Sequence, residues 1–166
     1  MLKRLKQTMS GLLAKSPATD PVSDQPSETV ISPLETQIGE WTDQYFKRTK
    51  AIVGHHGDVE VTYAIFMRRP VLCAPKLMLD WLAQVEQERG VSFKVEMQHE
   101  EGEQVGAGQP ILYLTGSFVA LADLETLLLQ KLGPPCVAAY NAYNMCSDLP
   151  GVSFLAMDVR HCAGLE

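Results

Sequence analysis

Residues 152–164 read VSFLAMDVRHCAG and stand close to the end of a chain of 166 residues. The run over residues 152–159 is apolar and β-branched and follows the turn pair Pro150-Gly151, a pattern that predicts a strand buried on both faces. Such strands usually belong to parallel sheets, and polar residues at their carboxyl ends commonly line the reacting centre. Three polar residues occur at the end of this one: Asp158, Arg160 and His161. We therefore expect part of a ligand site there.

The composition fits one ordinary globular domain with extra segments, at 46% hydrophobic and 20% charged residues. The formal net charge of −6 argues against a nucleic-acid-binding protein, which needs clustered Lys and Arg. No apolar run reaches the roughly 18 residues of a transmembrane helix, and no secretory signal is evident. These features together predict a cytoplasmic protein.

The four cysteines show no C-x-x-C spacing and lie among apolar residues: Cys73, Cys136, Cys146 and Cys162. This pattern predicts free, buried thiols in a reducing compartment. His161 beside Cys162 lacks the second spaced pair of ligands that a zinc site needs, so no metal site is expected.

Residues 1–33 differ in composition from the rest. Residues 1–15 carry four basic and no acidic residues, with leucines near helical spacing, which fits either a frayed arm or a surface-binding or targeting helix. Residues 16–32 are rich in Pro and Ser. We interpret residues 1–33 as a disordered basic arm followed by a linker.

The first helix is predicted to begin at the capping box Ser32-Pro33-Leu34-Glu35. A second start signal at Thr42-Asp43 leaves open whether one helix or two run to Gly54 or Gly57. Alternation predicts a half-buried strand over residues 58–69. A helix from Pro75 to Gly90 and two more strands follow, with the strands at residues 91–97 and 111–115.

The segment between the last two strands contains Gly102, Gly106 and Gly108, which permit the positive φ of tight turns. After it, a leucine-rich helix over residues 119–132 is expected to be buried and to end at Gly133. Pro134-Pro135 is expected to separate it from a second helix over residues 137–145.

Four short motifs, in this order, are similar to those of the nicotinate phosphoribosyltransferases, a family related to quinolinate phosphoribosyltransferase. They are Thr42-Asp43-Gln44-Tyr45, then Glu101-Gly102-Glu103-Gln104-Val105 with Gln109-Pro110-Ile111-Leu112, then Leu124-Glu125-Thr126 up to Gly133, and Val159-Arg160-His161. The resemblance covers roughly residues 40–164, and the ordered combination is more specific than any one piece.

The resemblance implies an α+β and α/β architecture in which residues 34–118 form an α/β sandwich. Residues 119–166 would supply connecting helices and the first strand of an α/β barrel. Because such a barrel takes roughly 250 residues, we expect the phosphate-binding loops to lie beyond Gly164. The sequence would then be the front part of a larger enzyme and inactive alone.

The family joins nicotinate to phosphoribosyl pyrophosphate, usually with ATP, giving nicotinate mononucleotide and pyrophosphate. By resemblance, Tyr45 would stack on the pyridine ring, Arg160 would pair with the carboxylate or a phosphate, and His161 would line the pocket. Three neighbours would support them: Thr42, Asp43 and Asp158. ATP and Mg²⁺ are expected for the full-length enzyme, and a homo-oligomer is implied. No catalytic residue and no metal ligand is expected within this chain.

Each site residue also has a purely structural interpretation: Tyr45 as a core aromatic, Arg160 as a salt-bridged strand end, His161 as an interior histidine. A second hypothesis is a non-catalytic sandwich domain that binds a partner through the apolar helix of residues 121–132. A third is a quinolinate enzyme, for which Arg68 and Arg69 would hold the second carboxylate.

Overall fold

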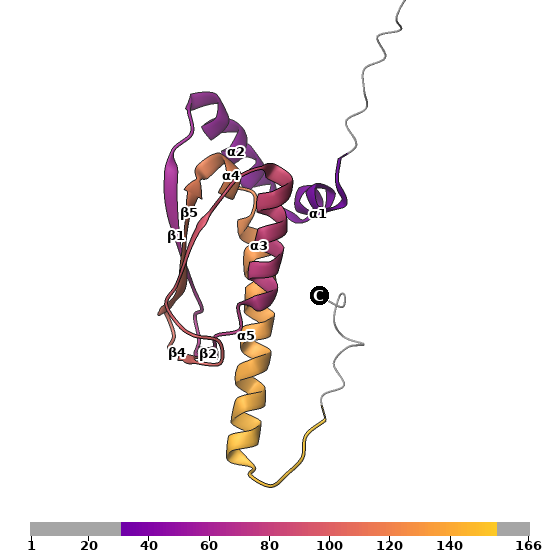
Figure 1. Ribbon diagram of the computed structural model, residues 1–166, viewed down its shortest axis with the longest axis vertical. Helices are drawn as coiled ribbons and strands as arrows, with labels where there is room; N and C mark the ends of the chain where they lie inside the picture. Colours follow the sequence, from indigo (N-terminus) through magenta and orange to yellow (C-terminus); the bar gives the residue numbers. More distant parts are fainter. Residues whose placement is uncertain (1–30, 156–166) are drawn as a thin grey trace, which may run out of the picture. The chain divides into compact units, whose positions relative to one another are not determined.

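The computed structural model describes residues 31–155, which belong to the second of the two units into which the chain divides, Met1–Val30 and Ile31–Glu166. Ten elements follow one another (Figure 1): α1 (Pro33–Trp41), α2 (Gln44–His56), β1 (Glu60–Phe66), β2 (Val71–Leu72), α3 (Lys76–Arg89), β3 (Lys94–Met97), β4 (Gln104–Val105), β5 (Pro110–Ser117), α4 (Phe118–Leu121) and α5 (Glu125–Asp148).

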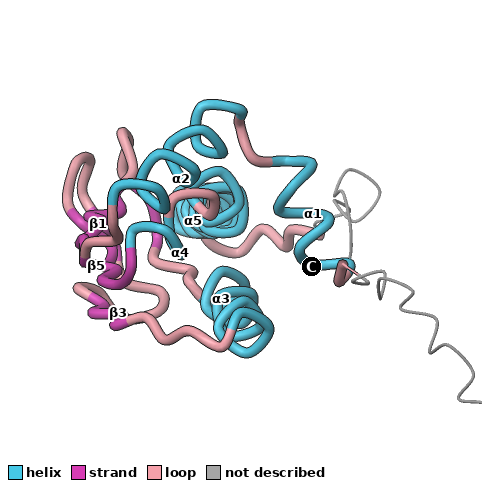
Figure 2. Tube along the Cα trace, turned by 90° about the horizontal axis from the view of Figure 1, so that it is seen from above, coloured by secondary structure: helices cyan, strands magenta, loops and turns pink. Residues whose placement is uncertain are grey.

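The centre of the fold is a three-stranded antiparallel sheet in the order β1-β5-β3. Helices α3 and α5 lie on one face of it (Figure 2). The core between these layers is apolar and contains Ile65, Leu112, Leu114, Met78, Trp81, Leu127 and Leu128. A separate pair, β2 and β4, forms a second small sheet. The predicted α+β class and sandwich arrangement are confirmed.

The predicted starts of the first two helices are also confirmed. Glu35 N donates to Ser32 Oγ at 3.1 Å, and Pro33 occupies the first turn of α1. Helix α1 ends at Thr42, whose backbone is extended, so α1 and α2 are two helices. Helix α2 ends at Gly57, which has a φ of 111°, a conformation that favours glycine.

The three predicted strands appear as β1, β3 and β5, and Gly102 and Gly108 take the expected positive φ, whereas Gly106 does not. Alternation identified these strands because one face of the sheet is buried. Strands β2 and β4 were not predicted. Each is only two residues long, which is too short to show a periodic pattern in the sequence.

The predicted helix over residues 119–132 and the break at Pro134-Pro135 were both wrong. The break lies at residues 122–124, between α4 and α5, and α5 runs continuously through both prolines. An internal proline costs about 3 kcal/mol. Leu132 before the pair and Cys136 after it are both fully buried, and Cys136 Sγ accepts a hydrogen bond from Ala74 N at 3.4 Å. Packing of the helical turns on both sides of the prolines against one core outweighs the local preference.

The predicted strand at residues 152–159 is not formed over its described part. Residues 152–155 belong to no strand, and Val152 and Leu155 are 55% and 85% exposed. A buried strand needs a neighbour, and no strand of the described chain pairs with this segment. Residues 156–159 lie outside the described residues.

The cysteine prediction holds for Cys73 and Cys136, which are free and buried, but was wrong for Cys146, which is exposed. Cys146 lies in the second half of α5, which extends past the sheet (Figure 1) and so has little to pack against. Cys162 lies outside the described part. Among residues 31–155, none of the helices combines the length and the apolar character that crossing a bilayer requires.

Candidate functional site

The Thr-Asp-x-Tyr motif lies at the corner between α1 and α2. Thr42 is 4% exposed, and its Oγ1 donates to the backbone oxygen of Asp123 at 2.7 Å. Asp43 stands at the N-cap position of α2 without a side-chain capping bond. Tyr45, in the first turn, is 57% exposed, with its ring 4.0 Å from that of Phe46. Tyr45 is therefore not a core aromatic but a ring presented at the surface.

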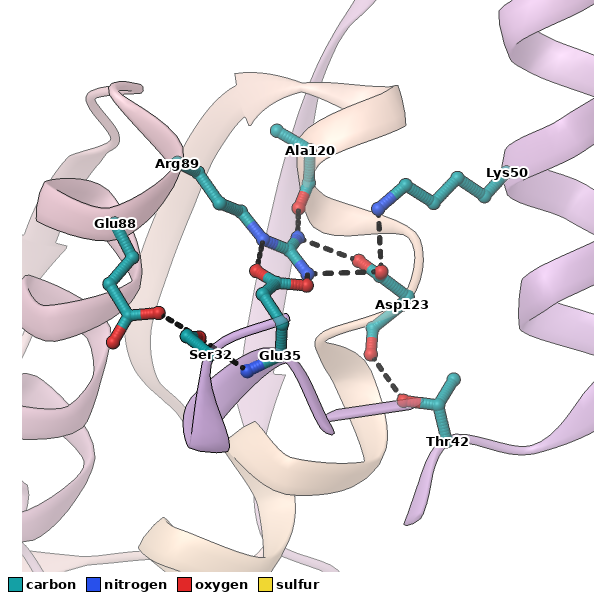
Figure 3. A network of polar contacts seen from close by, with 8 residues as sticks. All are labelled: Ser32, Glu35, Thr42, Lys50, Glu88, Arg89, Ala120 and Asp123. Carbon is teal, nitrogen blue, oxygen red and sulfur yellow. Dashed lines mark hydrogen bonds and ion pairs between the residues drawn. The ribbon is translucent and has the colours of Figure 1, made fainter. Parts of the chain in front are cut away.

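Asp123 is the centre of a polar network that joins four helical segments (Figure 3). Arg89, the last residue of α3, donates to Asp123 Oδ1 at 2.8 Å and to Oδ2 at 3.1 Å. Lys50 of α2 donates to the same Oδ2 at 2.6 Å. Arg89 also contacts Glu35 of α1 through two hydrogen bonds of 2.6 and 3.1 Å.

Further bonds complete the network. Arg89 donates to the backbone oxygen of Ala120 at 2.9 Å, and Ser32 donates to Glu88. One guanidinium thus holds the start of α1, the connection after α4 and the end of α3 together. Arginine suits this position because its planar fork can serve two carboxylates at once.

The pKa shifts in the network follow from this pairing. Burial alone would lower the pKa of Arg89, but hydrogen bonds to Glu35 and Asp123 outweigh it, so that the pKa is raised. Burial would likewise raise the pKa of Asp123, but hydrogen bonds from Arg89 and Lys50 hold it below its ordinary value. Arg89 and Asp123 are therefore both charged at neutral pH.

A second cluster gathers around Glu125, two residues beyond Asp123. Burial, and then the neighbouring carboxylate of Asp43, raise the pKa of Glu125. Desolvation and the charge of Glu125 raise the pKa of both Tyr45 and Tyr63. The two phenols thus remain neutral near a partly buried carboxylate, and each can donate a hydrogen bond.

A groove with a volume of about 470 Å³ runs between β1 and the first turns of α5. Residues 62–66 of β1 form one wall, and Glu125, Leu128 and Leu129 form the other, with Arg68 at one end. The groove therefore has an apolar middle with an acid and a base on its border.

These contacts define what the site can do. The ion pairs of the network join two acidic side chains, Glu35 and Asp123, to two basic ones, Arg89 and Lys50. Such paired groups position a helix and do not act as a free nucleophile or base. No group of three His, Cys, Asp or Glu side chains within residues 31–155 could hold a metal ion. What the corner offers a ligand is the exposed ring of Tyr45.

Of the residues predicted from sequence, Thr42, Asp43 and Tyr45 come together at this corner. Asp158, Arg160 and His161 lie outside the described residues. Sequence reasoning missed Asp123, Arg89 and Lys50. A signal for Asp123 was present, because it is the single charged residue within the apolar run of residues 118–124; a lone acid there must find a buried partner.

No protein-family model and no curated protein matches the chain in sequence. The fold is similar to that of human nicotinic acid phosphoribosyltransferase, with a TM-score of 0.52 and 19% identity over 69% of this chain and 30% of that one. A nicotinate-nucleotide pyrophosphorylase from Pyrococcus furiosus shares 22% identity over 65% of this chain and 28% of its own, with a TM-score of 0.49.

The likeness to the human enzyme establishes the fold. The described residues share their fold with part of human nicotinic acid phosphoribosyltransferase. The resemblance in architecture inferred from the motifs is thereby confirmed. The chain spans about 30% of the length of the human enzyme.

Proposed function

We propose that this chain is part of a phosphoribosyltransferase that acts on a pyridine carboxylate in NAD biosynthesis, with nicotinate as the preferred substrate. The observation that carries the proposal is the fold shared over 69% of the chain with the human enzyme. The corner between α1 and α2, which carries the Thr-Asp-x-Tyr motif, is the second support. Tyr45 is exposed there on a helix that the Asp123 network holds in place. Cytoplasmic localisation belongs to the same proposal.

In the proposed reaction the pyridine nitrogen forms a bond to C1 of the ribose in phosphoribosyl pyrophosphate, and the bond from C1 to the pyrophosphate oxygen breaks. Pyrophosphate leaves with the bonding electrons. Positive charge develops on the ribose in such a transfer, so the protein's task is orientation and charge compensation.

The proposed roles follow the sequence motif. Tyr45 would stack on the pyridine ring, in its own site or a neighbouring subunit's. Arg160 would hold the carboxylate through two parallel hydrogen bonds, and His161 would line the pocket. Asp158 would orient Arg160. ATP and Mg²⁺ use belongs to the whole enzyme, and residues 31–155 do not fit a metal site of their own. Activity of this chain alone is not expected.

The competing hypothesis of a partner-binding module relied on the apolar helix of residues 121–132. Within this segment Leu121, Leu124, Leu127, Leu128 and Leu132 are buried by the protein's own core. Only Leu129 is notably exposed, at 41%. The proposed docking helix is thus used internally, against the described sheet, and this version of the hypothesis is wrong.

Titration calorimetry of nicotinate into the chain, with and without phosphoribosyl pyrophosphate, tests the proposal. The Arg160→Ala variant should lose the heat of binding, and Lys94→Ala, which removes an exposed positive charge on β3, should keep it. Parallel titration of quinolinate decides between the two substrates. Binding that survives in Arg160→Ala would contradict the assigned role, and absence of binding of either acid would mean that this chain does not form the pyridine carboxylate site by itself.

A further inference from the structure

The groove between β1 and α5 carries opposite charges at its two ends. Tyr63 of β1 lies near Glu125, in the first turn of α5, and both line the groove. A Cβ added at Gly133 would lie 3.6 Å from Met67 Cε, so the residues just after β1 lie beside Gly133. Glu125 and Gly133 are about 12 Å apart along the helix axis. The acid is therefore at one end of the groove, and Arg68 is at the other.

Glu125 brings a half-buried carboxylate to the groove, and no cation of the described chain matches it. Among the described residues, none forms a hydrogen bond or an ion pair with this side chain. Burial, and then the like charge of Asp43, raise its pKa, which is the opposite of what a neighbouring base would do. Lys50 of the same helix as Asp43's cap is already bound to Asp123. A cation placed beside Glu125 would therefore be attracted and would stabilise its charge.

The surface next to this carboxylate is aromatic and apolar. Tyr63 is half-buried, and its hydroxyl makes no hydrogen bond to any described residue. A phenol ring attracts a cation through its face, and its oxygen can accept a hydrogen bond from an ammonium group. Leu129 and Phe66 follow along the groove and are 41% and 49% exposed. The volume of about 470 Å³ is within the range of small-molecule sites and is too small for a protein interface.

We propose that this groove binds a small organic ammonium ion with a flat apolar body, whose nitrogen lies against Glu125. The ammonium donates to the Glu125 carboxylate and to the Tyr63 hydroxyl, and the body covers Leu129 and Phe66. Charge selects this occupant, because a neutral molecule leaves the carboxylate unpaired and an anion is repelled by it. Tyr45 is not among the described residues that line the groove, and the proposal does not depend on the proposed enzymatic function.

Titration of phenethylamine into the isotope-labelled full chain, followed by proton–nitrogen correlation NMR, tests this site. Phenethyl alcohol and phenylacetate carry the same ring with a neutral and a negative head, and serve as matched probes. The amine should bind saturably in the millimolar range, about fivefold more tightly than the alcohol. The amides of Tyr63, Glu125 and Leu129 should shift most.

Four results would overturn the proposal. They are shifts that do not saturate by about 10 mM amine, equal affinity for the alcohol, tighter binding of phenylacetate, which the Arg68 end would select, and shifts confined to residues outside the groove.

Two variants separate the charge from the apolar surface. In Glu125→Gln the amine should bind no more tightly than the alcohol, whose own affinity should stay unchanged. Leu129→Asn alters an exposed side chain and should weaken both probes. Glu96→Gln removes an exposed carboxylate that pairs with Lys94 on β3, and as the control it should keep the wild-type affinities. A preference for the amine that persists in Glu125→Gln would refute the assignment.

Discussion

Replacing Asp123 by Asn tests whether the polar network holds the helices together. The substitution keeps the size of the side chain but removes the negative charge of the carboxylate, which accepts two hydrogen bonds from Arg89 and one from Lys50. The side chains of Asp123 and Arg89 are only 12% and 11% exposed, so water replaces these bonds poorly. Arg89 keeps Glu35, and Lys50 can turn to solvent at 34% exposure. We therefore expect a loss of about 2–3 kcal/mol in the free energy of unfolding, toward the low end for a broken buried pair.

Urea denaturation followed by circular dichroism measures this loss. With a slope of about 1.5 kcal/mol per molar urea, the midpoint should fall by roughly 1.3–2 M. Asp80→Asn is the matched control, since its ion pair with Lys76 is exposed on both sides and its loss should leave the midpoint essentially unchanged. A midpoint for Asp123→Asn no lower than that of the control would refute the view that the network stabilises the fold. The lowered pKa of Asp123 adds a pH signature: its contribution is present above the ordinary pKa of 3.8 and is lost as pH falls below that value.

Two further predictions concern glycines and Glu125. Gly90→Ala should lower the free energy of unfolding by about 1 kcal/mol, because Gly90 has a φ of 61° that alanine adopts poorly. Gly54→Ala, inside α2 and equally free of close neighbours, should raise the free energy of unfolding by about 0.5–1 kcal/mol. Equal shifts of the melting temperature in the two variants would contradict the backbone argument. The pKa of Glu125 is raised in the fold, so its charged form opposes folding once pH exceeds its ordinary value of 4.5. Glu125→Gln should therefore raise the free energy of unfolding by about 0.5 kcal/mol or less at pH 7 and leave it unchanged near pH 3.5. A lower free energy of unfolding in this variant at pH 7 would contradict the prediction.

Local patterns were sufficient for most of the sandwich. The cap at Ser32, the alternation in β1 and the stop at Gly90 each depend on residues close in sequence, and all are found as expected. The errors occurred where distant residues decide. The double proline stays helical because Leu132 and Cys136 are packed by elements far away in sequence. Residues 152–155 have the composition of a strand but no strand to pair with among the described residues.

The candidate site was predicted in part for the same reason. The motif at Thr42, Asp43 and Tyr45 is contiguous and could be recognised from sequence. The groups that hold it lie far along the chain: Thr42 contacts Asp123 over 81 positions, and Lys50 contacts Asp123 over 73. Spacing along one helix or strand cannot reveal such pairs. Only the isolation of Asp123 in an apolar run indicated that a partner was required.

Helix α2 shows why these distant contacts bear on function. It contains no buried residue, so apolar packing holds it less firmly than α3 or α5. Thr42, two residues before its start, and Lys50, in its second turn, both bind Asp123, one through the backbone oxygen and one through the carboxylate. Tyr45 lies between these two attachment points. Its ring is thus exposed while its backbone is fixed at both sides, as the stacking role proposed for Tyr45 would require.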